Sequence, residues 1–215
     1  MDPRTDVDFG GSGSQAVESA RSLVSMNWFT RVFKGDGGRA NDPESVVRFY
    51  QRLGFFGHVD PATVVRRYVE DHGNPPNPAE VWDQVFLLAY SEGDVWSGDP
   101  EADVCAENEV YSEVLVEWAR ISGGAFSPVD IREEWDGEEG PITLSFGLGG
   151  HRVSVAPSYQ DDWIDLEVLR QINGLIQSSG RQFECAVDGN FVLVLCLTAD
   201  QKAKMRAERQ FPFAW

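Results

Sequence analysis

Two groups of acidic residues, each next to a tryptophan, are the side chains in this sequence that could take part in catalysis or metal binding. They are Glu133, Glu134, Asp136, Glu138 and Glu139 around Trp135, and Asp161 and Asp162 before Trp163. Paired carboxylates can serve as general acid and base, or hold a metal ion. Both groups fall where we expect loops or strand ends, and charge at such places is ordinarily solvated. We therefore favour a contact surface, with the tryptophans as anchors and the acids as a charged rim.

A third acidic set lies in a helix expected near residues 100–121. Glu109, Glu113 and Glu117 are four residues apart, so they share one side of that helix and repel each other by roughly 0.2–0.5 kcal/mol per pair. We expect no basic residue of the helix to relieve them. The opposite side carries an apolar stripe of Val104, Tyr111, Leu115 and Trp118. The glutamates could be a solvated face, or a face that meets a basic surface.

The charge of the chain points to a cationic partner. The formal net charge is −17, and residues 68–119 contain 13 carboxylates but no Lys or Arg. Such a field repels nucleic acid and anionic membranes and attracts a basic protein. The densest basic run, Lys202 to Arg209, is interrupted by Glu208 and forms no stripe of the kind that binds nucleic acid.

Metal and cofactor motifs are missing from the sequence. His58, His72 and His151 have no partner at metal-ligand spacing. The run from Asp99 lacks the glycine and the final glutamate of a calcium loop. The glycines at 147, 149 and 150 are followed by a strand pattern, which indicates a hairpin and not a phosphate loop. We expect no metal, no cofactor and no enzymatic activity.

Composition also suggests where the protein resides. The start of the chain has no apolar segment of a secretory signal, and no stretch approaches the roughly 20 apolar residues of a membrane span. Cys105, Cys185 and Cys196 are widely spaced, as free thiols in a reducing compartment would be. We expect a cytoplasmic protein, and the sequence leaves its oligomeric state open.

The first half of the chain carries helix signals. Asp or Asn precedes Pro at residues 42, 60, 77 and 99, a pairing that caps and starts helices. Asn77 with Glu80 adds a pair resembling a capping box. We expect an all-helical half after a flexible arm rich in glycine and serine. The ranges are an arm at 1–14 and helices near 16–33, 43–55, 61–71, 78–91 and 100–121.

The second half changes to the alternation of strands. Val129, Ile131, Glu133 and Trp135 alternate with polar residues, and two further strands flank a Gly149-Gly150 turn. A helix near 165–178, two strands around residues 188–190 and a final helix capped by Thr198 and Gln201 follow. We predict an α+β fold with a helical acidic region at 15–124 and an α+β domain at 125–215. The helical half packs with a C-terminal βββαββα unit containing a mainly antiparallel sheet.

Residues 141–209 resemble a known group of proteins. The pieces that carry the likeness are Ile142–Phe146, Asp161-Asp162-Trp163-Ile164-Asp165, Leu169–Asn173, and Phe191–Leu195 running into Leu197-Thr198-Ala199-Asp200-Gln201. This order resembles the immunity proteins that accompany bacterial polymorphic toxins. The resemblance implies stoichiometric inhibition of a toxin without catalytic residues.

The acidic segment independently suits that role. We expect a protein that neutralises a basic partner, possibly a toxin or nuclease, through the acidic residues and tryptophans already named. Two alternatives stay open. One is a small hydrolase that uses the acidic clusters, and the other is a scaffold or regulatory module that inhibits nothing.

Overall fold

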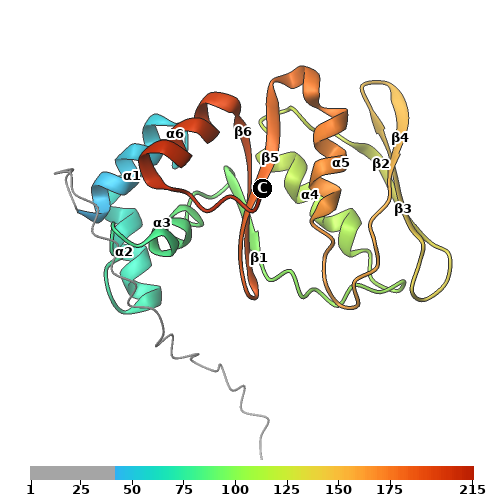
Figure 1. The fold of residues 1–215 in the computed structure, drawn as a ribbon, viewed down its shortest axis with the longest axis horizontal. Helices are drawn as coiled ribbons and strands as arrows, with labels where there is room; N and C mark the ends of the chain where they lie inside the picture. The colour runs from blue at the N-terminus through green and yellow to red at the C-terminus, as the bar shows by residue number, and fades with distance from the viewer. Residues whose placement is uncertain (1–41) are drawn as a thin grey trace, which may run out of the picture. The chain divides into compact units, whose positions relative to one another are not determined.

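Two antiparallel sheets and the helices around them make up residues 42–215, the part of the chain that this computed structural model describes (Figure 1). The arm expected at 1–14 and the helix expected near 16–33 lie outside the described residues. The α+β fold class predicted from the sequence is confirmed, with helices first and a βββαββα order in the second half.

Three short helices come first and bury one face each. They are α1 (Pro43–Arg52), α2 (Pro61–His72) and α3 (Val81–Leu88). Asp42 caps α1 as predicted, because its side chain accepts a hydrogen bond of 2.9 Å from the Ser45 amide. The buried side chains of these helices, among them Tyr50, Val64 and Leu87, form a core with one face of the first sheet.

The first sheet has β6 (Phe191–Thr198) in the middle, between β1 (Val95–Gly98) and β5 (Arg181–Asp188). Six consecutive residues of β6, Val192 to Leu197, are buried, as the continuous apolar run predicts. Leu193 and Leu195 face the core shared with α1–α3, while Val192 and Val194 face a second core. Both faces of this sheet are therefore covered.

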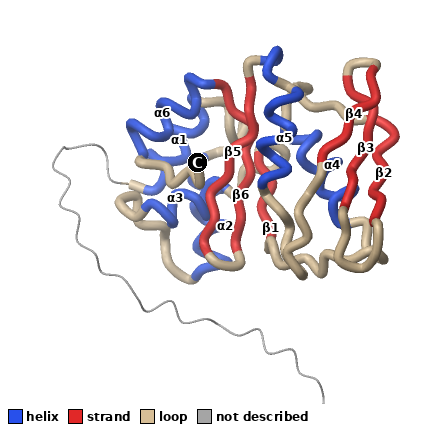
Figure 2. Tube along the Cα trace, turned by 45° about the vertical axis from the view of Figure 1, so that its right-hand side comes forward, coloured by secondary structure: helices blue, strands red, loops and turns tan. Residues whose placement is uncertain are grey.

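The second core lies between the two sheets. It contains α4 (Val110–Ile121) and α5 (Glu167–Leu175), and on its far side the sheet of β2 (Val129–Trp135), β3 (Ile142–Leu148) and β4 (His151–Val155). Figures 1 and 2 both show α4 and α5 between the sheets. The rings of Phe126, Phe146 and Phe183 meet edge to face across this core, at centroid distances of 5.5 Å and 6.0 Å from Phe126.

The last helix, α6 (Ala199–Arg209), begins with the capping box predicted from Thr198 and Gln201. Its Met205 is fully buried in the first core. The Gln201 side chain also donates to the backbone oxygen of Leu53, which links the start of α6 to the end of α1. The C-terminal half thus completes the core of the helices that precede it.

The outer edge of β5 is covered by polar contacts. The Asn173 side chain on α5 accepts from the Phe183 amide at 2.6 Å and donates to the Phe183 carbonyl at 2.8 Å. The Ala214 amide donates to the Cys185 carbonyl at 2.8 Å. An amide side chain here takes the place of a neighbouring strand, which keeps an exposed edge from pairing with another chain.

Three local predictions were wrong. The first half is not all-helical, because Val95–Gly98 forms β1 and pairs with β6. The helix expected near 100–121 begins at Val110, since the Asp99 side chain accepts from the Glu101 amide in a tight turn instead of capping a helix. Asn77 likewise accepts from Ala79, and α3 begins only after Glu80.

Candidate functional site

Strand β2 brings Glu133 and Trp135 to the same side of the second sheet, facing α4. Glu133 accepts a hydrogen bond of 3.0 Å from the Ser112 amide in the first turn of α4, and one of 3.1 Å from the Trp135 indole. Burial raises the pKa of Glu133, although both of these hydrogen bonds favour its charged form and so lower it. Glu133 is therefore a helix cap and an anchor for the indole, in place of the free rim carboxylate expected.

The Trp135 ring packs against Tyr159, from a loop that follows β4. The two rings meet edge to face at a centroid distance of 5.9 Å. Shielding from water raises the pKa of Tyr159, and the carboxylates of Asp161, Glu139 and Asp162 raise it further. These acids therefore lie near Tyr159.

Two loops from distant parts of the chain lie side by side next to this pair. The Ala102 amide donates to the Asp162 carbonyl and the Ile164 amide donates to the Pro100 carbonyl, each at 2.8 Å. Glu101 and Trp163 form an isolated antiparallel bridge between the same loops. The acidic segment before α4 is thus fixed against the Asp161-Asp162 segment.

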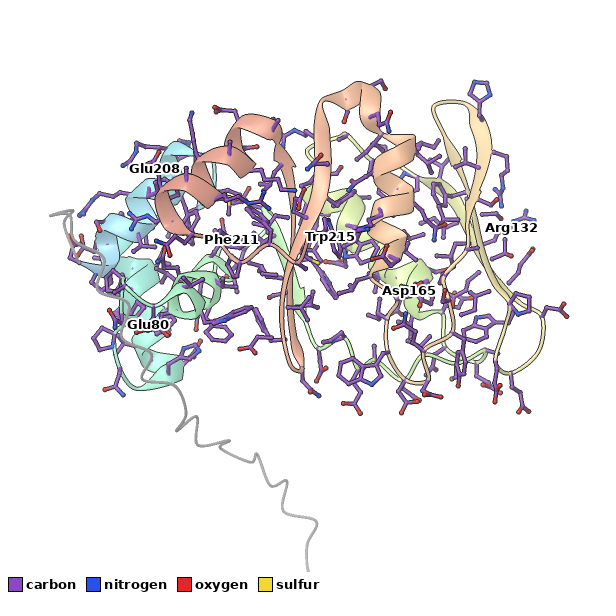
Figure 3. All side chains as sticks on the ribbon, in the orientation of Figure 1. Glu80, Arg132, Asp165, Glu208, Phe211 and Trp215 are labelled. Atoms are coloured by element: carbon purple, nitrogen blue, oxygen red, sulfur yellow. The ribbon has the colours of Figure 1, made fainter. Side chains whose placement is uncertain are left out.

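We call this region the acidic face, and define it by residues 99–109, 137–141 and 156–166 together with Glu133 and Trp135. These residues include eleven carboxylates and no Lys, Arg or His. Among the described residues, no Lys or Arg forms an ion pair with any of these carboxylates. Figure 3 shows oxygen-tipped side chains along the lower edge of the molecule, around and below Asp165.

Asp165 is the buried member of the set and holds the loop in place. Its carboxylate accepts from the amides of Ser158 at 2.8 Å and Glu167 at 3.0 Å. Its own amide donates to the hydroxyl of Tyr111 on α4, at 2.9 Å. Burial raises the pKa of Tyr111 to about 12. These bonds fix the 156–166 loop to α4.

The other predicted contact residues do not all join this region. Glu134 and Asp136 alternate with Glu133 and Trp135, and Glu134 pairs with the exposed Thr143 on the outer side of the sheet. Figure 3 shows Arg132 on that outer side, away from α4.

On α4, Glu109 stands at the N-terminal end of the helix, next to Glu133. Glu113 is exposed, and Glu117 forms an ion pair of 2.5 Å with Arg120. The expectation that no basic residue relieves the three glutamates was therefore wrong. The apolar stripe is confirmed for Tyr111, Leu115 and Trp118, which are buried on α4, whereas Val104 is buried but lies before the helix begins.

A small pocket of about 280 Å³ opens beside Trp163 at the edge of the acidic face. Its lining is mostly apolar and includes Pro100, Ile164, Leu166 and Val187. Trp163 is partly exposed there, as an anchor residue would be. The pocket has room for one side chain of a partner.

Two observations bear on what the site could do chemically. The two oxygens of Glu133, the half-buried acid, already accept internal hydrogen bonds. Within residues 42–215, no three His, Cys, Asp or Glu side chains come together to hold a metal ion. No helix in the same range is long and apolar enough to cross a membrane.

No protein-family model matches the chain, and neither a curated protein nor a solved structure matches it. The interpretation of the site therefore rests on its own geometry and charge.

Sequence reasoning missed three residues that build the site: Tyr159, Asp165 and Tyr111 as a hydrogen-bond partner. Tyr159 stands two residues before Asp161, so its position near acids could have been predicted from the sequence, although its contact with Trp135 could not. The Tyr111–Asp165 contact joins residues 54 positions apart, and no local pattern encodes it.

Proposed function

We propose that this protein binds a basic protein through the acidic face and inhibits it, as an immunity protein inhibits a toxin. The observation that carries the proposal is the aromatic pair Trp135 and Tyr159, with carboxylates near Tyr159 that form no ion pair with a Lys or Arg among the described residues. Tryptophan and tyrosine supply binding energy at interfaces, and unpaired surface charge supplies steering and specificity.

The face is preorganised for such binding. Its loops are tied to each other through Ala102 and Ile164, and to α4 through Glu133 and Asp165. Association then orders few additional residues, which lowers the entropic cost of binding. The pocket beside Trp163 adds a place for one apolar side chain of the partner.

The partner we infer is a cationic toxin, and a nuclease is the leading class. A surface that binds nucleic acid is basic, and the acidic face complements it. The resemblance of residues 141–209 to immunity proteins supports the same role, and a cytoplasmic location belongs to this proposal. The hydrolase alternative has less support at Glu133, because both of its carboxylate oxygens already accept internal hydrogen bonds.

The test is binding to the product of an adjacent toxin-like gene, measured by surface plasmon resonance at several salt concentrations. We expect a complex whose association rate falls as salt rises. The double substitution Asp161→Asn and Asp162→Asn should slow association and make its rate less dependent on salt. Glu134→Gln with Asp60→Asn is the charge-matched control, since Glu134 lies on the outer side of the second sheet and Asp60 is exposed at the start of α2.

Relief of toxicity gives the second readout. Co-expression of the chain should rescue cells from the toxin, and the Asp161/Asp162 variant should rescue less well than its control. Equal association rates and equal rescue for the two variants would show that the acidic face is a solvated surface and not the inhibitory one.

A further inference from the structure

A second candidate site lies on other elements of the fold, where α2 and α3 meet the strands β1 and β6. A pocket of about 390 Å³ opens there, and its volume is within the usual range for small-molecule sites. The residues that line it are His72, Phe86, Ala89, Tyr90, Ser97 and Phe191. Four of these six carry an aromatic ring, so the pocket is lined mainly by π-systems.

The aromatic side chains of the lining pack into one cluster. Phe86 meets Phe191 edge to face at a centroid distance of 4.9 Å, and the His72 ring lies 6.2 Å from Phe86 and 6.4 Å from Tyr90. Behind them, Tyr68 stacks on His72 at 4.2 Å. His72 Nδ1 lies 3.0 Å from the Tyr68 carbonyl oxygen, which can only accept, so this nitrogen carries a hydrogen and donates it. Contacts within the fold therefore hold the rings in place.

Negative charge reaches this pocket through the rings and not through carboxylates in its lining. No Asp, Glu, Lys or Arg belongs to the lining in the described part of the chain. The Tyr90 hydroxyl donates to the carboxylate of Asp71 at 2.7 Å, and the Tyr68 hydroxyl donates to that of Asp83 at 3.1 Å. A phenol that donates to a carboxylate has a more electron-rich ring, and such a ring attracts a cation more strongly.

The surroundings of the pocket also favour a cation. Five of its six lining residues belong to the segment 68–119, which contains 13 carboxylates and no Lys or Arg. The arginines of α2 lie outside the lining and are each paired, Arg66 with Glu70 at 3.9 Å and Arg67 with Glu92 at 3.1 Å. A cation gains from this charge, whereas a neutral apolar ligand does not.

The lining discriminates between kinds of cation. An ammonium or guanidinium group brings several N–H donors, and each needs an acceptor when it leaves water. The side chains of the lining offer few acceptors, chiefly the hydroxyls of Ser97 and Tyr90 and the second ring nitrogen of His72. A trimethylammonium group has no N–H donor, and its charged methyl groups are attracted to the faces of aromatic rings.

We propose that this pocket binds a small trimethylammonium compound, of which choline is the simplest. Its methyl groups contact the rings of Phe86, Tyr90 and Phe191, and its hydroxyl bonds to the exposed Ser97. This site is independent of the acidic face and of the inhibition proposed for it.

Titration of the whole chain with choline, followed by NMR of the backbone amides, tests the proposal. We expect a dissociation constant of about 1 mM or lower, with the largest shifts at the lining residues. The compound 3,3-dimethyl-1-butanol has the shape of choline but a neutral carbon in place of the nitrogen. Ethanolamine keeps the charge but has N–H donors in place of the methyl groups. Each should bind at least about tenfold more weakly than choline. A smaller difference for either, or weaker binding of choline than expected, would overturn the proposal.

The source of the trimethylammonium group is tested in the same way. The amide of Nα-acetyl-Nε-trimethyllysine carries this group on a longer side chain with a peptide backbone. We expect it to bind more weakly than choline, because the lining provides contacts for the small molecule alone. Tighter binding of the lysine derivative would replace the small ligand with a methylated protein.

A ring substitution locates the ligand. Phe191→Leu removes one aromatic face from the lining and should weaken choline binding about tenfold. Phe213→Leu is the matched control, because Phe213 is also partly buried but lies outside the lining, and it should leave binding unchanged. Equal binding by the two variants would contradict the site.

A charge substitution at an exposed residue tests the same site without disturbing the core. Asp71→Asn keeps an acceptor for Tyr90 but removes the charge, and should weaken choline binding about threefold. Asp60→Asn removes the same charge at the other end of α2, about 18 Å away and beyond the screening length of about 8 Å, so it should have no effect. Equal binding by these two variants would show that Asp71 does not contribute, against the proposal.

Discussion

The carboxylate of Glu133 on β2 accepts a hydrogen bond of 3.0 Å from the backbone amide of Ser112, in the first turn of α4. An acid from a neighbouring strand therefore satisfies an amide that the helix itself leaves unpaired. The same carboxylate holds the Trp135 indole, so the start of α4 and the aromatic pair of the acidic face share one support.

The first prediction concerns the pH dependence that Glu133 causes. Its pKa is raised by burial above the ordinary value of 4.5, so the folded state holds this proton more tightly than the unfolded state does. The tighter proton binding stabilises the folded state below pH 4.5, and this stabilisation is lost as pH rises through the folded pKa. Glu133→Gln removes the titration. We therefore measure the unfolding free energies of wild type and variant by urea titration at several pH values. The wild-type value minus the variant value should decrease as pH rises from 4.5 through the folded pKa of Glu133.

A second prediction concerns Tyr111. Tyr111→Phe removes the acceptor of the buried Asp165 amide, which should cost about 1–3 kcal/mol of unfolding free energy. The loop at 156–166 should also exchange its amide hydrogens faster. Tyr159→Phe is the matched control, since no described hydrogen bond uses its hydroxyl, and we expect little change in stability. Equal stabilities for the two variants would mean that the Tyr111 bond is dispensable.

The third prediction concerns the edge of β5. Asn173→Ala leaves the Phe183 amide and carbonyl without their side-chain partner, which should cost about 1–3 kcal/mol and expose an edge for pairing. Denaturant unfolding and light scattering measure the two effects. Asn190→Ala, in an exposed turn, removes one surface hydrogen bond to Glu101 and should do neither.

A fourth prediction distinguishes Glu109 from Glu117 on α4. One turn of helix rises about 5.4 Å, and charges are screened beyond about 8 Å at physiological salt. Glu109 adjoins the acidic face, whereas Glu117 is two turns away and paired with Arg120. Glu109→Gln should slow association with the basic partner and flatten its salt dependence, while Glu117→Gln should leave both unchanged. A larger effect from Glu117→Gln would place the contact surface along α4.

Structural features set by residues close together in the sequence could be predicted. Thr198 and Gln201 cap α6, and Asp42 caps α1, because each bond joins residues three apart. The inward position of Glu133 was readable too, since it alternates in step with Ile131 and Trp135 along β2. Reading it as a solvated acid gave more weight to its charge than to its place in the strand.

Structural features that depend on contacts between residues far apart in the sequence could not be predicted. The four residues of β1 are too few to show the alternation of apolar and polar residues that indicates a strand. Their conformation depends on pairing with β6. The Asp-Pro pair at residue 99 marks a turn, because the chain there meets the loop at 160–165 and leaves no room for a helix. Tyr159 reaches Trp135 only after β3 and β4 have folded back on β2.

The pairing of β1 with β6 also bears on synthesis of the protein. The helices α1–α3 bury their apolar faces on β6 and α6, which leave the ribosome about a hundred residues later. Until then those faces can pack only on one another, so the nascent first half is exposed to aggregation and to chaperones. Contacts of such long sequence separation also slow folding, so the chain matures only after its last strand and helix are made.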